Sequence, residues 1–236
     1  ARGSGKRIIY FGLSGENDFY PQEVTLNEFS SHFTYCRNGK AMGEVTLPLS
    51  GTHNISNSLS VIALGLYLGI SRARIEEAFA AFKGTERRFQ LKCDAGGIRL
   101  IDDYGHHPAE IRATLSAAKN LKAKRLIVIF QPHRYSRTKF LMDEFAESFS
   151  AADCLIITDI YGASEEPIAG VSSEVLCEKI KEMHPLMRVV YARKESVIER
   201  ILDIAEPQDV VVTLGAGDIG KLSDELAGRI KGKNTF

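Results

Sequence analysis

Short, almost wholly apolar runs alternate with helical stretches over the last three fifths of the chain. The apolar runs are 98–101, 125–130, 154–158, 188–191 and 210–214, and the helical stretches are 109–120, 138–150, 173–183, 194–205 and 219–231. Apolar strands separated by helices are typical of a parallel sheet that is covered on both faces. We therefore expect an α/β domain with a doubly wound, mostly parallel, Rossmann-like sheet over residues 92–236.

The preceding segment, residues 1–91, has fewer predicted elements. In chain order they are a strand, a two-stranded hairpin and two helices, at residues 8–13, 33–37 with 43–48, 54–69 and 72–82. Asn38-Gly39 favours the tight turn of the hairpin, and Ser71 is suited to cap the second helix. These elements make a poor independent fold, so we expect an incomplete end of a larger α/β domain.

Composition and charge narrow the classes of function. With 236 residues, 44% of them hydrophobic, the chain has enough apolar material for one large or two small cores. Thirty Lys and Arg balance thirty Asp and Glu. Because no net field attracts nucleic acid or an anionic membrane surface, we expect neither as a partner. An anionic ligand must instead be held by local basic groups.

Cysteine usage and hydropathy indicate the compartment. The four cysteines are far apart, form no CxxC pair and lie in or beside apolar or helical stretches: Cys36, Cys93, Cys154 and Cys177. We interpret them as small hydrophobic residues, which favours the cytosol and argues against structural zinc. The most apolar stretch, 61–70, is shorter than the ~20 residues of a membrane span. We expect a cytoplasmic protein.

The segment Gly51-Thr52-His53-Asn54-Ile55-Ser56-Asn57 begins a predicted helix with two amide side chains about one turn apart. Amides in this position can bond the edge of a planar base. Asn is also among the commonest helix-capping residues, so a purely structural role for Asn54 stays open.

Arg87 and Arg88 lie immediately before the second domain. A planar guanidinium can hold a transferring phosphate through two parallel hydrogen bonds. Adjacent arginines are often solvated surface residues, and the pattern alone leaves both interpretations open.

The segment Asp102-Asp103-Tyr104-Gly105-His106-His107-Pro108 follows an apolar strand and precedes a helix. It therefore lies at the carboxyl end of a strand, where open α/β sheets bind their ligands. Its side chains accept protons, bind ribose hydroxyls or ligate metals. Adjacent histidines rarely point at one ion and no helical i, i+4 pair is present, so we do not expect a metal here.

The segment Gln131-Pro132-His133-Arg134-Tyr135-Ser136-Arg137 follows the next strand along the chain, at the same edge of the sheet. Arg134 and Arg137 are three residues apart and can converge on one carboxylate if the chain turns helical. The alternative is simply a basic helix start. Since the helix dipole disfavours cations there, a bound anion is an equally good interpretation.

A glycine-rich segment, Gly215-Ala216-Gly217-Asp218-Ile219-Gly220, joins the last predicted strand to the last helix and fits GxGxxG. A dinucleotide site also needs a further strand and an acidic residue ~20 positions later. The chain offers neither, so we interpret the glycines as a tight turn with close helix packing.

Taken in order, these motifs resemble those of the Mur ligases, which join an amino acid to a UDP-sugar carboxylate through an acyl phosphate made from ATP. The resemblance covers nearly the whole chain, and GTHNISN, RRFQ and DDYGHHPAE carry it on the nucleotide side. It implies ATP-binding roles for His53, Asn54, Asn57, Arg88, Asp103 and Tyr104. The first three would hold adenine, Asp103 the ribose, and Arg88 the phosphates as a catalytic residue.

The amino-acid side is implied by YGHH at 104–107 and QPHRYSR at 131–137, which resemble the branch of the family that adds L-alanine to UDP-N-acetylmuramate. By this resemblance His106, His133, Arg134 and Arg137 would surround the alanine. The two arginines would hold its carboxylate, and the histidines would lie near the attacking amine, with His106 as a catalytic residue.

One departure from the family is large. No GxxxxGK[ST] phosphate-binding loop occurs in the sequence, and we expect the magnesium ligands upstream of this chain. Residues 1–91 would then be the end of the central ATP-binding domain and 92–236 the family's carboxyl-terminal domain. We expect a bacterial ligase fragment without activity of its own. The open alternatives are a nucleotide- or carboxylate-binding module without turnover, and another family member.

Overall fold

The computed structural model describes residues 8–82 and 84–232, and the chain divides into two compact units between Gly84 and Thr85. The predicted boundary between residues 91 and 92 falls inside the second unit, within a strand that the hydrophobic pattern does not reveal. Arg87 and Arg88 therefore belong to the second unit.

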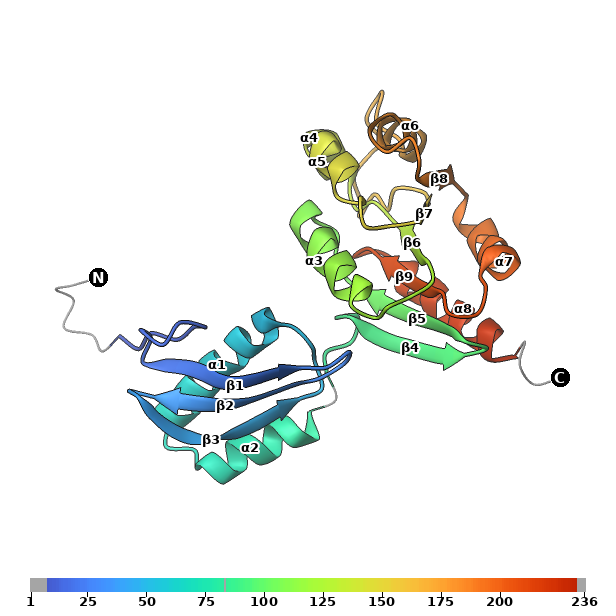
Figure 1. Ribbon diagram of the computed structural model, residues 1–236. Helices are drawn as coiled ribbons and strands as arrows, with labels where there is room; N and C mark the ends of the chain where they lie inside the picture. Colours follow the sequence, from blue (N-terminus) through green and yellow to red (C-terminus); the bar gives the residue numbers. More distant parts are fainter. Residues whose placement is uncertain (1–7, 83, 233–236) are drawn as a thin grey trace. The chain divides into compact units, whose positions relative to one another are not determined.

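The first unit has a three-stranded antiparallel sheet and two helices (Figure 1). Its elements are β1 (Phe19–Leu26), β2 (Ser31–Arg37), β3 (Lys40–Leu47), α1 (Thr52–Tyr67) and α2 (Arg72–Ala81). The predicted hairpin is confirmed, with Asn38 and Gly39 at φ angles of 48° and 80° in its turn. The Ser71 cap is confirmed as well, because its side chain accepts a hydrogen bond from the Arg74 amide.

The strand predicted at residues 8–13 is wrong. Within this run only Phe11 pairs, through a single bridge to Phe19, and most of its large apolar side chains are exposed. The outer strand is instead β1, in which only Phe19 and Tyr20 are buried. Its pattern gives little signal, and Pro21 argues against a central strand, but an edge strand tolerates proline.

The second unit contains a six-stranded sheet in the order β4-β5-β9-β6-β7-β8. Its strands are β4 (Gln90–Ala95), β5 (Ile98–Asp103), β6 (Leu126–Phe130), β7 (Cys154–Ile157), β8 (Arg188–Tyr191) and β9 (Val210–Leu214). Five strands are parallel, which confirms the predicted fold class, and β4 pairs antiparallel with β5. Strand β4 was not predicted because it is half-exposed and mixes polar with apolar residues.

Helices cover both faces of this sheet, with α3 and α5 on one side and α7 and α8 on the other (Figure 1). The helices are α3 (Pro108–Lys119), α4 (Tyr135–Phe140), α5 (Met142–Glu147), α6 (Ser173–Met183), α7 (Lys194–Ile204) and α8 (Ile219–Gly232). The single helix predicted over 138–150 is two short helices, because Leu141 leaves helical geometry at φ −113°, ψ 21°. All four cysteines are buried, as interpreted from the sequence.

The strand register brings the candidate segments to one edge. Asp103 at the end of β5 pairs with Leu214 of β9, Leu214 pairs with Phe130 of β6, and Phe130 pairs with Ile157 of β7. The loops that follow these four strands therefore leave the sheet side by side, at its carboxyl edge. In the described part of the chain, no helix is long and apolar enough to cross a membrane.

Candidate functional site

Two adjacent aspartates end β5 and have different surroundings. The buried Asp102 side chain accepts hydrogen bonds from Arg87 Nε at 2.8 Å and Thr213 Oγ1 at 2.7 Å. Asp103 accepts from the backbone amides of Phe89 and Gly105, each at 2.7 Å. Asp102 is thus a structural anchor, whereas Asp103 is held by main-chain donors at the rim of the sheet.

Burial raises the pKa of the Asp103 carboxyl, and the hydrogen bonds from the Gly105 and Phe89 amides oppose that rise. Gly105 is needed for this geometry, because a Cβ there would lie 2.8 Å from Asp103 Oδ1. Each carboxylate oxygen has more than one acceptor site, so Asp103 keeps capacity for a ligand hydroxyl.

The structure separates the two candidate phosphate-binding arginines. The guanidinium of Arg87 is bound to Asp102 and donates to the carbonyls of Gly215 and Gly217. It is committed to the fold, so a phosphate role for Arg87 is not supported. Arg88 is exposed, with its guanidinium carbon 5.7 Å from the centre of the Tyr104 ring. It is the arginine that a phosphate could reach.

Each glycine of the GxGxxG segment faces a close neighbour, as the interpretation of close packing expected. A Cβ on Gly215 would lie 2.7 Å from the Gln131 carbonyl, one on Gly217 2.6 Å from Tyr161 Cγ, and one on Gly220 2.8 Å from Arg87 Nε. Gly215 also has a φ angle of 148°. The segment therefore packs the ends of β5, β6 and β7 together.

Four aromatic rings form a row across the carboxyl edge of the sheet: Tyr104, His106, His133 and Tyr161. Neighbouring ring centres are 5.4 Å, 5.6 Å and 5.6 Å apart in that order. The row begins in the β5–α3 loop, crosses the loop after β6 and ends in the loop after β7. The structure thus brings together three predicted site residues from two segments, and adds Tyr161.

Hydrogen-bond partners assign the tautomer of His106. Its Nδ1 lies 3.0 Å from the Tyr104 carbonyl oxygen, which can only accept, so Nδ1 carries the proton. In the neutral ring, Nε2 then has a lone pair. Glu110 Oε2 lies 3.5 Å from Nδ1, and although burial opposes the effect, the hydrogen bond from the His106 amide lowers the pKa of Glu110. The Glu110 carboxylate would therefore stabilise a protonated His106.

His133 has the opposite tautomer. Arg137 Nη1 lies 2.9 Å from His133 Nδ1, and because a guanidinium only donates, Nδ1 must accept and the proton must be on Nε2. Burial, followed by the positive charge of Arg137, lowers the pKa of His133. The two neighbouring imidazoles therefore offer different groups: a lone pair on His106 and an N–H on His133.

The expected helical turn after β6 is present. Arg134 precedes the first residue of α4 with a φ angle of 72°, and Arg137 lies in the first turn, where it contacts His133. Arg134 donates its amide to the Tyr161 carbonyl at 2.8 Å and leaves its side chain exposed. Cations at a helix start are unfavourable unless an anion is near. Glu165 supplies one such anion by accepting from the Ser136 amide and hydroxyl.

Sequence reasoning missed Tyr161, Glu165 and Glu110. Tyr161 and Glu165 belong to the irregular loop between β7 and α6, which contains no motif with a known spacing. A signal was present, because this loop follows the third parallel strand of the sheet and must leave it at the same edge. Glu110 has a helix-capping signature, accepting from the His107 amide at 3.1 Å, and that role hid its position beside His106.

The predicted adenine-binding residues lie in the first unit, at the start of α1. The helix begins at Thr52 after Gly51, which has a φ angle of 107°, so Asn54 is not the capping residue. Its side chain donates to the Ser50 carbonyl at 2.8 Å. His53 and Asn57 are exposed and four residues apart, on one side of the helix.

Within residues 8–82 and 84–232, no group of three or more His, Cys, Asp and Glu side chains could hold a metal ion. The histidines of the row instead contact a carbonyl, a carboxylate, a guanidinium and each other.

The fold and this edge define a class of protein: a doubly wound α/β domain that presents basic, imidazole and carboxylate groups at its carboxyl edge. The family model described as "Mur ligase, glutamate ligase domain" matches residues 87–217, more than half of the chain. The chain belongs to the Mur ligase family.

Individual relatives agree with this assignment. The UDP-N-acetylmuramate–L-alanine ligase of Geotalea uraniireducens (strain Rf4) is 46% identical over 228 residues, which cover 96% of this chain and 50% of the relative. The ligase of the same name from Koribacter versatilis (strain Ellin345) is 43% identical over 236 residues, 97% of this chain and 50% of the relative. The chain spans about half the length of these curated relatives.

Solved structures show the same fold. The UDP-N-acetylmuramate-alanine ligase MurC from Thermotoga maritima matches with a TM-score of 0.76 and 27% identity, over 93% of this chain and 47% of that one. The MurF ligase from Thermotoga maritima, solved in complex with ADP, matches with a TM-score of 0.62 and 17% identity, over 96% of this chain and 48% of that one. The second likeness concerns the fold alone.

Proposed function

We propose that this chain supplies the amino-acid side of a ligase that joins L-alanine to UDP-N-acetylmuramate through an acyl phosphate made from ATP. The row of rings with Arg134 and Arg137 beside it is the observation that carries the proposal. It places two guanidinium groups, the N–H of His133 and the lone pair of His106 at one edge of the second unit. The similarity to relatives named as alanine-adding ligases supports this choice of substrate.

On the amino-acid side, Arg134 and Arg137 would bind the alanine carboxylate, because guanidinium and carboxylate match in charge and geometry. His133 presents an Nε2–H, which suits an oxygen of the substrate. His106 presents the lone pair of Nε2, which suits the alanine ammonium. The two histidines thus have different roles, a distinction that the sequence did not make.

The chemical step follows from these roles. Nε2 of His106 takes one proton from the alanine ammonium, and the imidazolium is stabilised through Nδ1–H by the Tyr104 carbonyl and by Glu110 at 3.5 Å. The free amine attacks the carbonyl carbon of the acyl phosphate and the C–N bond forms; the C–O bond to the phosphate then breaks, and the departing phosphate takes the second proton of the amine. Positioning supplies much of the rate, because the amine must be held within reach of the acyl carbon and above the plane of its carbonyl group.

On the nucleotide side, we propose that Arg88 reaches the ATP phosphates, that Asp103 holds a ribose hydroxyl and that Tyr104 contacts the nucleotide. His53, Asn54 and Asn57 would contact the adenine, with the exposed His53 and Asn57 on one side of α1. ATP carries magnesium, which is usually bound by one or two carboxylates beside the phosphates. Among the described residues, no group of three or more His, Cys, Asp and Glu side chains could hold a metal ion.

A second candidate is a binding module that holds a nucleotide or an amino-acid carboxylate without turnover. The absence of a GxxxxGK[ST] motif from the 236 residues favours this reading for the isolated chain. Phosphate release by the purified chain, given ATP, UDP-N-acetylmuramate and L-alanine, would contradict it. We expect no release.

The proposed function is tested with the full-length ligase that contains this chain. ATP-dependent phosphate release is measured with UDP-N-acetylmuramate and one amino acid at a time: L-alanine, glycine, L-serine, D-glutamate or meso-diaminopimelate. We expect L-alanine to give the highest kcat/KM. A higher value for a larger amino acid would assign the chain to another branch of the family.

A further inference from the structure

We propose that Tyr161, seated on Gly217, is a positioning residue that holds His133 in one orientation with its single ring proton on Nε2. The purpose of this arrangement rests on the proposed function, since His133 would donate that N–H to the substrate. The contacts that carry the inference all lie within the second unit and are independent of any substrate.

The first step concerns the ring nitrogens of His133. Rotation of the imidazole by 180° would exchange Nδ1 with a carbon, and Arg137 Nη1 would lose its acceptor at 2.9 Å. It would also turn Nε2 to a different side of the ring. The orientation of the ring therefore decides whether His133 offers an N–H at the right place.

The second step concerns the ring of Tyr161, which stacks on His133 with a centre-to-centre distance of 5.6 Å and an interplanar angle of 17°. A nearly parallel ring on one face leaves the imidazole little freedom to tilt. The Tyr161 backbone adds two hydrogen bonds, one from its amide to the Pro132 carbonyl at 2.9 Å and one from the Arg134 amide to its carbonyl at 2.8 Å. Both residues that flank His133 are thus tied to Tyr161.

The third step concerns Gly217, which lies under the ring of Tyr161. A Cβ at this position would lie nearest to Gln131 Oε1, and 2.6 Å from Tyr161 Cγ and 2.8 Å from Tyr161 Cβ, so any other residue would displace the ring together with the Gln131 side chain. The Gly217 carbonyl accepts from Arg87 at 3.1 Å, which prevents the glycine from moving away. The glycine and the tyrosine form one support for His133.

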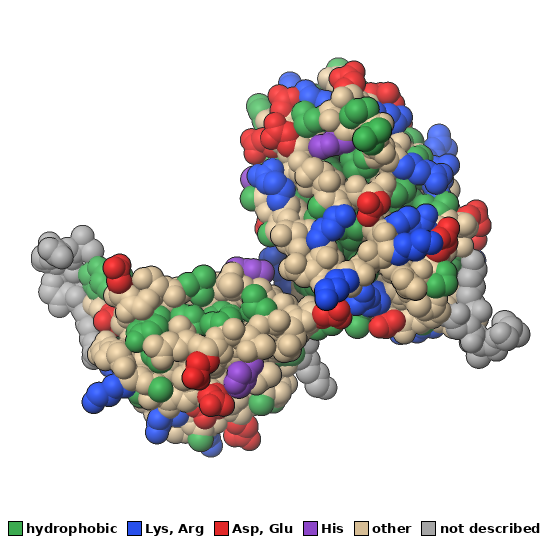
Figure 2. Space-filling view, viewed as in Figure 1, with side chains coloured by type: hydrophobic (Ala, Val, Ile, Leu, Met, Phe, Trp, Pro, Cys, Tyr) green, Lys and Arg blue, Asp and Glu red, His purple; other side chains and the backbone are tan. Residues whose placement is uncertain are grey.

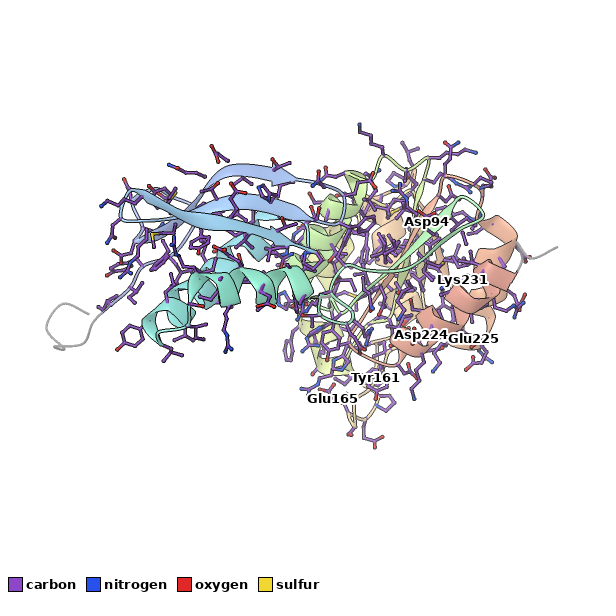
Figure 3. All side chains as sticks on the ribbon, turned by 90° about the horizontal axis from the view of Figure 1, so that it is seen from below. Asp94, Tyr161, Glu165, Asp224, Glu225 and Lys231 are labelled. Atoms are coloured by element: carbon purple, nitrogen blue, oxygen red, sulfur yellow. The ribbon has the colours of Figure 1, made fainter. Side chains whose placement is uncertain are left out.

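The loop that carries Tyr161 is itself fixed. Glu165, which lies close to Tyr161 in Figure 3, accepts from the Ser136 hydroxyl at 2.6 Å and from the Ser136 amide at 2.9 Å. These bonds lower the pKa of the Glu165 carboxyl, which therefore stays ionised. The β7–α6 loop is thus joined to the first turn of α4 through Glu165 and to the residue before that helix through Tyr161.

The inference is tested on the chain itself by nitrogen NMR of its imidazoles, which distinguishes the two neutral tautomers. For the unmodified chain at pH 7.5 we expect the Nε2–H signature at His133. Tyr161→Phe should keep it, because stacking needs only the ring. Tyr161→Leu and Gly217→Ala should each give exchange between tautomers at His133.

Two controls separate positioning from general damage. Phe140→Leu changes an aromatic residue of α4 whose side chain is 81% exposed, and should leave the His133 signal unchanged. His184 Nε2 donates to the Ala146 carbonyl at 3.0 Å, outside the row of rings, so its own Nε2–H signature reports whether each variant is folded. If Tyr161→Leu and Gly217→Ala keep both signatures, the inference is overturned. An Nδ1–H signature at His133 of the unmodified chain would also overturn it.

A kinetic measurement on the full-length ligase connects this support to function. Tyr161→Leu should raise the KM for L-alanine by roughly 10- to 100-fold, since a misplaced binding group costs about that much, and should leave the KM for ATP nearly unchanged. Tyr161→Phe should restore the normal value. The NMR result does not depend on the substrate, so a failure of the proposed function leaves it standing. Equal changes in both KM values would contradict the positioning role.

Discussion

At the scale of single residues, neighbours in the sequence have separate tasks. Arg87 and Arg88 share a residue type but not a role: the guanidinium of Arg87 is bound to Asp102 and to two carbonyls, and that of Arg88 is exposed beside Tyr104. The same division holds for Asp102 and Asp103. In each pair one residue holds the fold together, and the other is the one that we propose to contact the nucleotide.

This division predicts losses of stability of very different size for two matched substitutions. Arg87→Met leaves the buried Asp102 without its charged partner, and breaking a buried pair in this way costs roughly 3–5 kcal/mol. Arg88→Met removes an exposed group and should change the free energy of unfolding by less than about 0.5 kcal/mol. Urea unfolding of the chain measures both. Similar losses for the two variants would refute the division.

His133 predicts a pH dependence of stability. Because its pKa is lowered by burial and by Arg137, the unfolded chain binds a proton at this site more readily than the folded chain. Its contribution is present above the unfolded value of about 6.5 and is lost as the pH falls through the lower folded value. The opposing charge of Glu165 reduces the effect without reversing it.

The measurement compares urea midpoints at pH 7.5 and pH 5.5 for the unmodified chain and for His133→Gln. We expect the variant to lose less stability between these two values. Other titrating groups, Asp103 among them, are common to both proteins and cancel in the difference. An identical loss of stability in both proteins would show that His133 does not contribute to the pH dependence.

Much of the site could be predicted from residues that follow a strand directly. Asp103, His106 and His133 lie where the sequence placed them, because a parallel strand fixes where its next residues emerge. Tyr161 was not predictable, since its position depends on a loop path and on the space that Gly217 leaves. The tautomers of the two histidines were equally hidden, because they depend on the local backbone path that brings the Tyr104 carbonyl and the Arg137 guanidinium to the ring nitrogens.

At the scale of elements, the glycine-rich segment before α8 and the first turn of α8 allow close packing at the carboxyl edge of the sheet. Gly215 and Gly217 allow the loops after β6 and β7 to lie close to the backbone of this segment. Gly220, in the first turn of α8, leaves room for the Arg87 side chain. The glycine spacing of the GxGxxG motif therefore serves close packing of side chains and main chain in this protein.

Two glycines of α8 give a matched test. Gly220→Ala would place a Cβ 2.8 Å from Arg87 Nε and should destabilise the second unit. Gly228→Ala, in the exposed part of the same helix, meets no atom within 4 Å and should stabilise it by about 0.5–1 kcal/mol through helix propensity. Thermal unfolding followed by circular dichroism measures both. A stabilising Gly220→Ala would show that Arg87 does not need this space.

The element pattern was predictable where a run of apolar residues marks the strand. β6, β7 and β9 are buried throughout, and β5 and the edge strand β8 still contain mostly apolar runs, whereas β4 and β1 were missed because each is an edge strand that mixes polar with apolar residues. The break between α4 and α5 depends on the local geometry at Leu141, which periodicity does not encode.

At the scale of the whole molecule, the chain has two compact units and no excess of charge. Acidic and basic side chains are interspersed over the face shown in Figure 2, in agreement with thirty charges of each sign. Binding of phosphate and carboxylate must therefore depend on a few placed side chains. In the second unit, Arg88, Arg134 and Arg137 are the cations that the proposed function uses.

The central claim is that the loop after β6 binds the carboxylate of L-alanine. The most direct test measures the KM for L-alanine and for ATP in the full-length ligase with Arg134→Ala, beside Lys139→Ala as a control. Lys139 is an exposed cation on α4, the short helix that Arg134 precedes. A charge-assisted hydrogen bond is worth roughly 1.5–3 kcal/mol, which corresponds to an increase of about 10- to 150-fold.

We predict that Arg134→Ala raises the KM for L-alanine by that factor and changes the KM for ATP less than about twofold, and that Lys139→Ala changes neither. Equal increases in both KM values for Arg134→Ala, or the same alanine effect in Lys139→Ala, would contradict the account.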